Sequence, residues 1–140
     1  MPQNIVVGHK QLMAEAEAQV SHVNVAEALE MAKRGDVVIV DIRDIREVQR
    51  EGRIPGSLHA PRGMLEFWVD PESPYYKPVF TDDKTFILYC QADWRGTLAA
   101  ATLTDMGMAN VLHLQGGFGE WRKTGAPTAA RPDKTRPDKK

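Results

Sequence analysis

Two short apolar runs, Val37–Val40 and Phe86–Tyr89, constrain the fold more than any other feature of the chain. Both consist of β-branched, aliphatic or aromatic residues, and neither alternates between polar and apolar side chains. Strands with this pattern are buried on both faces, as they are in parallel sheets that helices cover. The two runs therefore predict central strands of a parallel sheet.

Segments with helical character separate these runs. The predicted helices cover residues 24–35, 44–51, 63–69, 96–107 and a segment that opens at Gly116, and further short strands are predicted at residues 57–60 and 110–114. Strands and helices that alternate at short intervals predict an α/β fold, a parallel sheet with helices on both faces.

The 140 residues suit one domain with additions at both ends. Residues 10–20 predict a helix outside the alternation, which could dock on the domain or on a partner. We therefore expect an N-terminal helical extension over residues 1–22, the α/β domain over 23–128 and a disordered charged tail over 129–140. Residues 62–80 mix aromatic residues with prolines and are interpreted as a cover for the core, with a dimer or partner surface as the sharper alternative.

Composition limits the kinds of partner and cellular compartment that we expect for this chain. A formal net charge of −1 gives no electrostatic reason to expect nucleic acid or a membrane surface as a partner. The N-terminus has no signal-peptide pattern, and no apolar stretch is long enough to span a bilayer. A single cysteine rules out an internal disulfide and a multi-cysteine metal site. We expect a cytoplasmic protein without a bound metal.

The cysteine, Cys90, follows the second apolar run and precedes the helix predicted from Gly96. Backbone N–H groups at such a junction have no carbonyl partners and can face an anion. Arg95 follows five residues later, so helix terminus and guanidinium could both stabilise a thiolate. The alternative is that Cys90 is only a small apolar residue at a strand end.

Other polar residues also stand at strand ends, where sites gather in parallel sheets. Asp41 and Arg43 close the first apolar run, and we expect them to orient neighbouring loops rather than to take part in chemistry. His59 stands near another strand end and is the histidine best placed to approach Cys90.

Four segments in order resemble the single-domain rhodanese family. They are Asp41-Ile42-Arg43, Gly52-Arg53-Ile54-Pro55-Gly56-Ser57-Leu58-His59-Ala60, the Cys-x4-Arg loop Cys90–Arg95, and Leu114-Gln115-Gly116-Gly117-Phe118 followed by Trp121. The likeness runs from about Val23 to Pro127.

This resemblance implies a five-stranded parallel sheet and a sulfurtransferase that carries sulfane sulfur as a persulfide on Cys90. Arg95 would hold an anionic donor, and the loop backbone would cradle the terminal sulfur. The loop residues concerned are Gln91, Ala92, Asp93, Trp94 and Gly96. The donor would be thiosulfate, a mercaptopyruvate or a protein-bound persulfide, and the acceptor a thiol, a protein thiol or cyanide. No cofactor is implied, and a monomer or a homodimer would serve equally.

Two residues depart from the family pattern, which often has glycine where this chain has Asp93 and serine where it has Gly96. Asp93 could face the pocket and repel a dianion, or cap the following helix and face solvent. We expect the first. Trp94 is expected at the rim of the site.

Two other functions compete with sulfur transfer. The dual-specificity phosphatases of the cell cycle share the fold, but their loop is one residue longer than Cys-x4-Arg, which favours sulfur over phosphate here. A non-catalytic binding module would use the aromatic segment or the N-terminal helix, and the presence of Cys90 argues against it.

Overall fold

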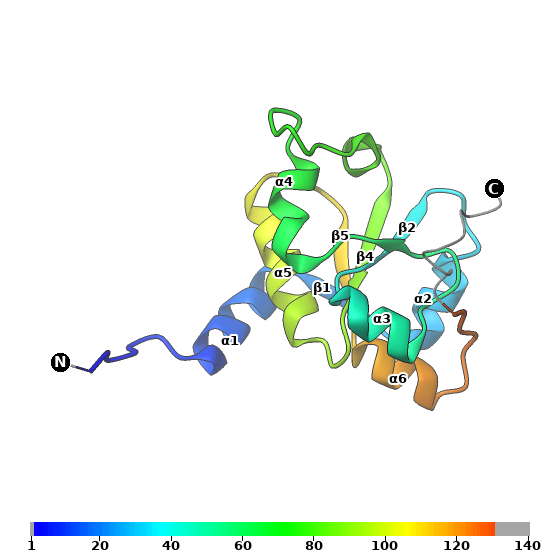
Figure 1. The fold of residues 1–140 in the computed structure, drawn as a ribbon, viewed down its shortest axis with the longest axis horizontal. Helices are drawn as coiled ribbons and strands as arrows, with labels where there is room; N and C mark the ends of the chain where they lie inside the picture. Colours follow the sequence, from blue (N-terminus) through cyan, green and yellow to red (C-terminus); the bar gives the residue numbers. More distant parts are fainter. Residues whose placement is uncertain (1, 131–140) are drawn as a thin grey trace.

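A five-stranded sheet forms the centre of the computed structural model, which describes residues 2–130 (Figure 1). The strands are β1 (Ser21–Val23), β2 (Val37–Asp41), β3 (Leu58–His59), β4 (Thr85–Tyr89) and β5 (Val111–Leu114). Their order is β1-β5-β4-β2-β3, and every neighbouring pair is parallel. The two apolar runs lie side by side as β2 and β4, which confirms the predicted parallel sheet.

Helices connect the strands. They are α1 (His9–Gln19), α2 (Val25–Met31), α3 (Ile45–Glu51), α4 (Leu65–Val69), α5 (Trp94–Asp105) and α6 (Gly117–Lys123), with short 3-10 helices at Arg62–Met64 and Pro78–Thr81. In residues 2–130, no helix has the length and apolar character needed to cross a membrane.

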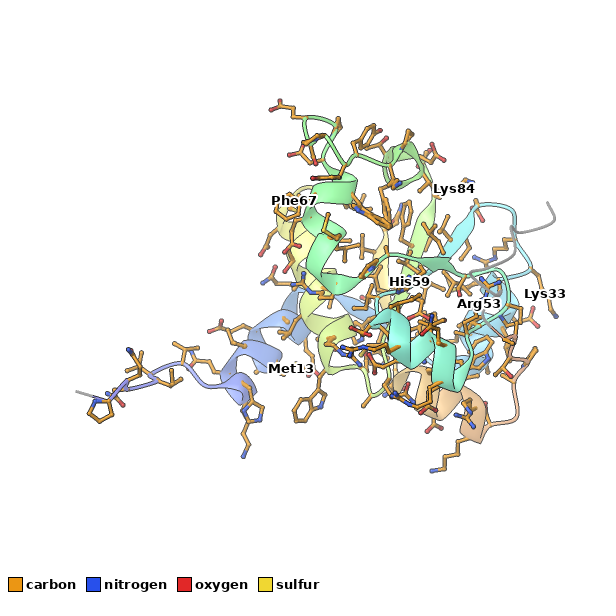
Figure 2. The ribbon with its side chains drawn as sticks, in the orientation of Figure 1. Met13, Lys33, Arg53, His59, Phe67 and Lys84 are labelled. Carbon is orange, nitrogen blue, oxygen red and sulfur yellow. The ribbon has the colours of Figure 1, made fainter. Side chains whose placement is uncertain are left out.

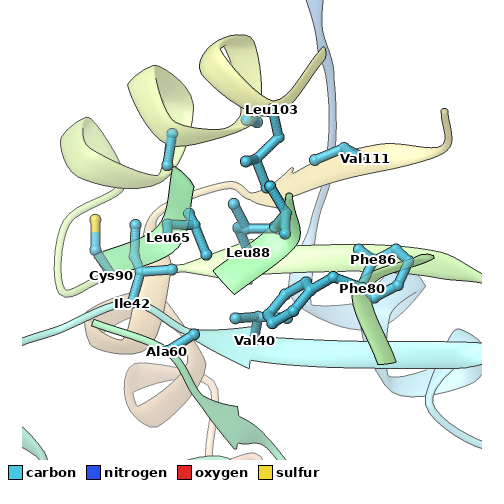
Figure 3. Packing of buried hydrophobic residues seen from close by; sticks show 13 residues of the cluster. Val40, Ile42, Ala60, Leu65, Phe80, Phe86, Leu88, Cys90, Leu103 and Val111 are labelled. Carbon is cyan, nitrogen blue, oxygen red and sulfur yellow. The ribbon is translucent and has the colours of Figure 1, made fainter. Parts of the chain in front are cut away.

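The core has two halves because successive residues of a strand point to opposite faces of the sheet. On one face, Val40 and Leu88 pack with side chains of α4 and α5, among them Leu103 (Figure 3). On the other face, Ile39 and Ile87 pack in a second cluster with side chains of α2 and α6. Helices therefore cover both faces, as predicted.

The N-terminal helix docks on the domain. Helix α1 runs along α5, although Ala16 is its only buried residue (Figure 1). The ring of His9, at the start of α1, stacks on Trp94 with 5.4 Å between the centroids. The chain then enters the sheet directly, because β1 begins at Ser21.

Helix α5 differs from its prediction, since it begins at Trp94 rather than at Gly96. Asp93 takes a left-handed conformation, φ 77°, and turns the chain into the helix two residues early. The Ala- and Leu-rich run marks the helix interior, whereas this backbone turn sets its start. Trp94 and Arg95 therefore belong to the first helical turn.

Residues 62–80 cover one end of the core. Leu65, Val69 and Phe80 are buried, whereas Phe67 on α4 and Tyr75 are more than half exposed. Figure 2 shows Phe67 on the outer side of α4. At the other end of the chain, Ala129 exchanges two backbone hydrogen bonds with Arg53. Residues 131–140 of the predicted tail lie outside the described residues.

Candidate active site

Cys90 stands at the carboxyl end of β4, on the edge of the apolar cluster, with its sulfur beside the loop that leads into α5 (Figure 3). The residue is 1% exposed. Its Sγ accepts hydrogen bonds from the N–H groups of Asp93 at 3.0 Å and Gly96 at 3.3 Å. Two backbone donors thus converge on one sulfur, an arrangement that can stabilise negative charge there.

The start of α6 holds the other side of this loop. The N–H of Phe118 donates to the carbonyl oxygen of Cys90 at 2.7 Å, and that of Gly119 to Gln91 at 3.0 Å. A Cβ on Gly117 would lie 2.5 Å from the Cys90 oxygen, and its φ is +62°. Because Gly117 has no side chain, the start of α6 can approach the backbone of the Cys90 loop closely and hold it in place.

Arg95 is near enough to Cys90 for the two charges to interact, but it is not a free cation. Its two terminal nitrogens donate to both carboxylate oxygens of Glu47 on α3, at 2.7 and 2.9 Å. The hydrogen bond to Glu47 raises the pKa of Arg95, and a charged Cys90 nearby raises it further against the opposing effect of burial. The same contact with Arg95 lowers the pKa of Glu47. Glu47 is a residue that the sequence reasoning missed.

Asp93 faces the protein interior, with 14% of its side chain exposed. Its carboxylate accepts from Nδ1 of His113 on β5, at 2.9 and 2.8 Å to its two oxygens. Burial raises the pKa of this carboxyl, while the bond to His113 acts in the opposite direction. The alternative of a solvent-facing cap is wrong: Asp93 holds the N-cap position of α5, but its side chain bonds to no helix N–H. The pairing with His113 was also missed.

Asp41 and Arg43 form a fully buried ion pair, with 2.7 Å between Oδ2 and a guanidinium nitrogen. The guanidinium also donates to Gln91 Oε1 at 3.1 Å and to the Gly52 carbonyl at 2.7 Å. Tyr89 completes the group, since its hydroxyl donates to Asp41 at 2.9 Å. These contacts tie three separate segments together, as a role in orienting loops would require.

His59 and Trp94 take less central places. Nε2 of His59 lies 2.8 Å from the carbonyl oxygen of Arg43, which accepts its hydrogen. Trp94 is 61% exposed at the outer side of the loop. Of the predicted site residues, the structure joins Arg95 and the loop backbone to Cys90, with Arg43 linked to them through Gln91.

One of the missed residues carried a signal in the sequence. Asp44 followed three residues later by Glu47 is the pattern of a capping box, which the structure contains at the start of α3. Oε1 of Glu47 serves both this cap and Arg95. For His113 no local pattern marks the pairing. Within residues 2–130 no cluster of His, Cys, Asp or Glu has the makeup of a metal site.

The chain resembles known proteins over most of its length. The family model of the rhodanese-like domain matches residues 24–124. A sulfurtransferase of Allochromatium vinosum is 31% identical over 100 residues, which are 71% of this chain and 85% of that protein. A dual specificity phosphatase Cdc25 of Arabidopsis thaliana is 28% identical over 127 residues, 84% of this chain and 83% of that protein.

A solved structure is more similar still. It is a protein of unknown function from Rhodopseudomonas palustris, described as a possible tyrosine phosphatase. It is 51% identical, with a TM-score of 0.88 over 91% of this chain and 98% of that chain. The fold, the order of the four motifs and the match over residues 24–124 agree, and the chain belongs to the rhodanese-like family.

Proposed function

We propose that the protein is a sulfurtransferase in which Cys90 carries sulfane sulfur as a persulfide. The observation that carries this proposal is the convergence of the Asp93 and Gly96 N–H groups on the buried sulfur, with Arg95 beside it. The similarity to a sulfurtransferase of A. vinosum supports the same reaction.

The first step is a displacement. The Cys90 thiolate attacks the sulfane sulfur of the donor, a new S–S bond forms, and the bond between that sulfur and the rest of the donor breaks. The bonding electrons leave with the donor remnant, as sulfite from thiosulfate, as the enolate of pyruvate from mercaptopyruvate or as a thiolate from an organic persulfide. N–H groups of residues 91–96 would hold the charged terminal sulfur.

The second step discharges the cysteine. An acceptor thiolate or cyanide attacks the outer sulfur of the persulfide, and the Cys90 thiolate leaves. The two steps together transfer one sulfur atom and regenerate the enzyme without electrons from another source. In this scheme Cys90 and Arg95 are the catalytic residues, while Asp41, Arg43 and His59 position the loops.

Intact-mass analysis tests the proposal. The protein is incubated with thiosulfate, mercaptopyruvate or glutathione persulfide, and its mass is measured before and after cyanide is added. We expect a gain of one sulfur atom with at least one donor, loss of that sulfur with formation of thiocyanate, and no gain in Cys90→Ser. No adduct with any of the three donors would overturn the proposal and favour a binding module.

Phosphatase activity is the second candidate, and the relatives described as phosphatases favour it. The loop argues against it, because only four residues separate Cys90 from Arg95. Hydrolysis of an aryl phosphate should therefore stay at the background rate of Cys90→Ser. A Cys90-dependent rate above that of sulfur transfer would reverse this assignment.

A further inference from the structure

Three polar side chains at the loop form a cluster that the proposed reaction does not itself use. It consists of Asp93, Thr97 on α5 and His113 on β5, and His113 is 3% exposed. A buried histidine paired with a buried carboxylate needs a physical reason, because both groups lose contact with water.

Asp93 has an unusual backbone. Its φ of 77° lies in the left-handed region, which glycine enters freely and other residues enter only when their surroundings hold them there. Aspartate enters this region less readily than glycine does, so the contacts that hold Asp93 there have a structural role.

Two contacts hold Asp93 at both ends. His113 Nδ1 donates to the carboxylate at 2.8–2.9 Å, and the Thr97 hydroxyl donates to the Asp93 carbonyl oxygen at 2.7 Å. The Thr97 oxygen also lies 3.3 Å from the same His113 nitrogen. With side chain and carbonyl fixed, the Asp93 N–H is left directed at Cys90 Sγ, 3.0 Å away.

We propose that His113 is a positioning residue for Cys90, acting through Asp93 to hold a backbone N–H on the reactive sulfur. This inference rests on the proposed function and extends it to a residue that touches neither the sulfur nor the donor. It also gives the Asp93 side chain a role, because its carboxylate accepts the hydrogen bond from His113.

Other charged groups surround the pair and have to be separated from its effect. On β1, the ring of His22 lies 5.8 Å from that of His113, and Glu17 on α1 acts on Asp93 through its charge. A change in charge at position 113 would alter the electrostatic interactions among all these groups. The experiment therefore compares two neutral replacements that differ in hydrogen bonding.

The test uses His113→Leu and His113→Asn, each in the wild-type chain and with Asp93→Gly. The asparagine amide nitrogen can take the place of Nδ1 and donate to the carboxylate, whereas leucine cannot. The readout is the rate of alkylation of Cys90 by iodoacetamide as a function of pH, which reports on one thiol because the chain has one cysteine. Circular dichroism confirms that each variant is folded.

His113→Leu should lower the alkylation rate at neutral pH about tenfold, by moving the midpoint of the pH profile up by about one unit. His113→Asn should keep the wild-type profile. With Asp93→Gly present, His113→Leu should have no further effect, because glycine adopts a positive φ without a hydrogen bond from His113. That double variant also keeps the test valid should His113→Leu alone fail to fold.

An unchanged profile in a folded His113→Leu variant would overturn the inference, as would an effect of equal size in the Asp93→Gly background. Alkylation requires no sulfur donor. A protein that passes this test but never takes up sulfur would therefore contradict the proposed function and leave the role of His113 standing.

Discussion

The carboxylate of Asp93 occupies the space that a side chain at Gly96 would need, because a Cβ there would lie 2.9 Å from Asp93 Oδ1. These are the two positions at which the loop departs from the family pattern. Gly96 has an ordinary helical backbone, so its conformation does not require glycine. The two departures are therefore coupled: an inward Asp93 requires the absence of a side chain at position 96.

This coupling predicts that Gly96→Ala destabilises the wild-type chain but stabilises the Asp93→Gly variant. In the wild-type chain the new methyl group should displace the Asp93 carboxylate from His113 and lower the free energy of unfolding. With Asp93→Gly the space is open, and the better helix propensity of alanine should raise that free energy by up to about 1 kcal/mol.

Urea unfolding of the four proteins in this double-mutant cycle measures the effect. We expect a coupling free energy of about 1 kcal/mol or more between positions 93 and 96. Additive effects would show that the carboxylate can move aside without loss.

Gly117→Ala should damage the site from its other side. The added Cβ would lie 2.5 Å from the Cys90 oxygen and 2.8 Å from the Gln91 carbonyl. Both are backbone groups, which cannot move aside as the end of a flexible side chain can. We expect a loss of about 2 kcal/mol or more in the free energy of unfolding, together with slower sulfur loading of Cys90.

Gly125→Ala is the matched control, since Gly125 also has a positive φ of 81° but no atom within 4 Å of an added Cβ. It should show only the backbone strain, about 1 kcal/mol, with normal sulfur loading. Equal losses in the two variants would mean that close packing at Gly117 contributes nothing.

The features that sequence alone could predict are local ones. The buried strands follow from two apolar runs, and the N–H groups around Cys90 follow from its place between a strand and a helix. The polar helix at residues 44–51 was predicted as well. Each of these depends on residues that are neighbours in the chain.

The features that could not be predicted join distant segments. Glu47 and Arg95 are 48 residues apart, and Asp93 and His113 are 20 apart. Whether such side chains meet depends on the order of the strands and on small backbone turns, such as the left-handed residue Asp93. The sequence places Arg95 near Cys90 but carries no sign that a carboxylate already holds it.

Glu47 is predicted to limit the use of anionic donors. A carboxylate about 8 Å from the donor would disfavour each of its negative charges by about 2 kcal/mol at an effective dielectric constant of about 20, and partial exposure reduces this figure. Glu47→Gln removes that charge and keeps a side chain that can accept from Arg95. The KM for thiosulfate should fall by roughly tenfold, with little change for an uncharged organic persulfide.

Steady-state kinetics with both donors measures this difference. Glu66→Gln serves as the control, because Glu66 on α4 pairs with Arg62 of the preceding 3-10 helix and makes no contact with Arg95. It should leave both KM values unchanged. An equal fall for the charged and the uncharged donor would point to a change in loop shape rather than in charge.

The same ion pair predicts how stability depends on pH. Its hydrogen bond to Arg95 holds the pKa of Glu47 below its usual value of 4.5 in the folded protein. A carboxyl whose pKa is lowered by folding stabilises the folded state above its unfolded pKa, and this stability is lost as the pH falls through the folded value. The pair is partly exposed, with 41% of the Arg95 side chain accessible, so we expect a contribution of about 1 kcal/mol.

Glu47→Gln should therefore be less stable than the wild type by a constant amount above about pH 5.5, and the difference should shrink between about pH 4.5 and 3. Urea unfolding of both proteins over this range provides the measurement. Asp93, whose raised pKa works in the opposite direction, is present in both proteins and cancels from the difference. A difference that stays constant down to pH 3 would show that the stability of the pair does not come from the ionised carboxylate.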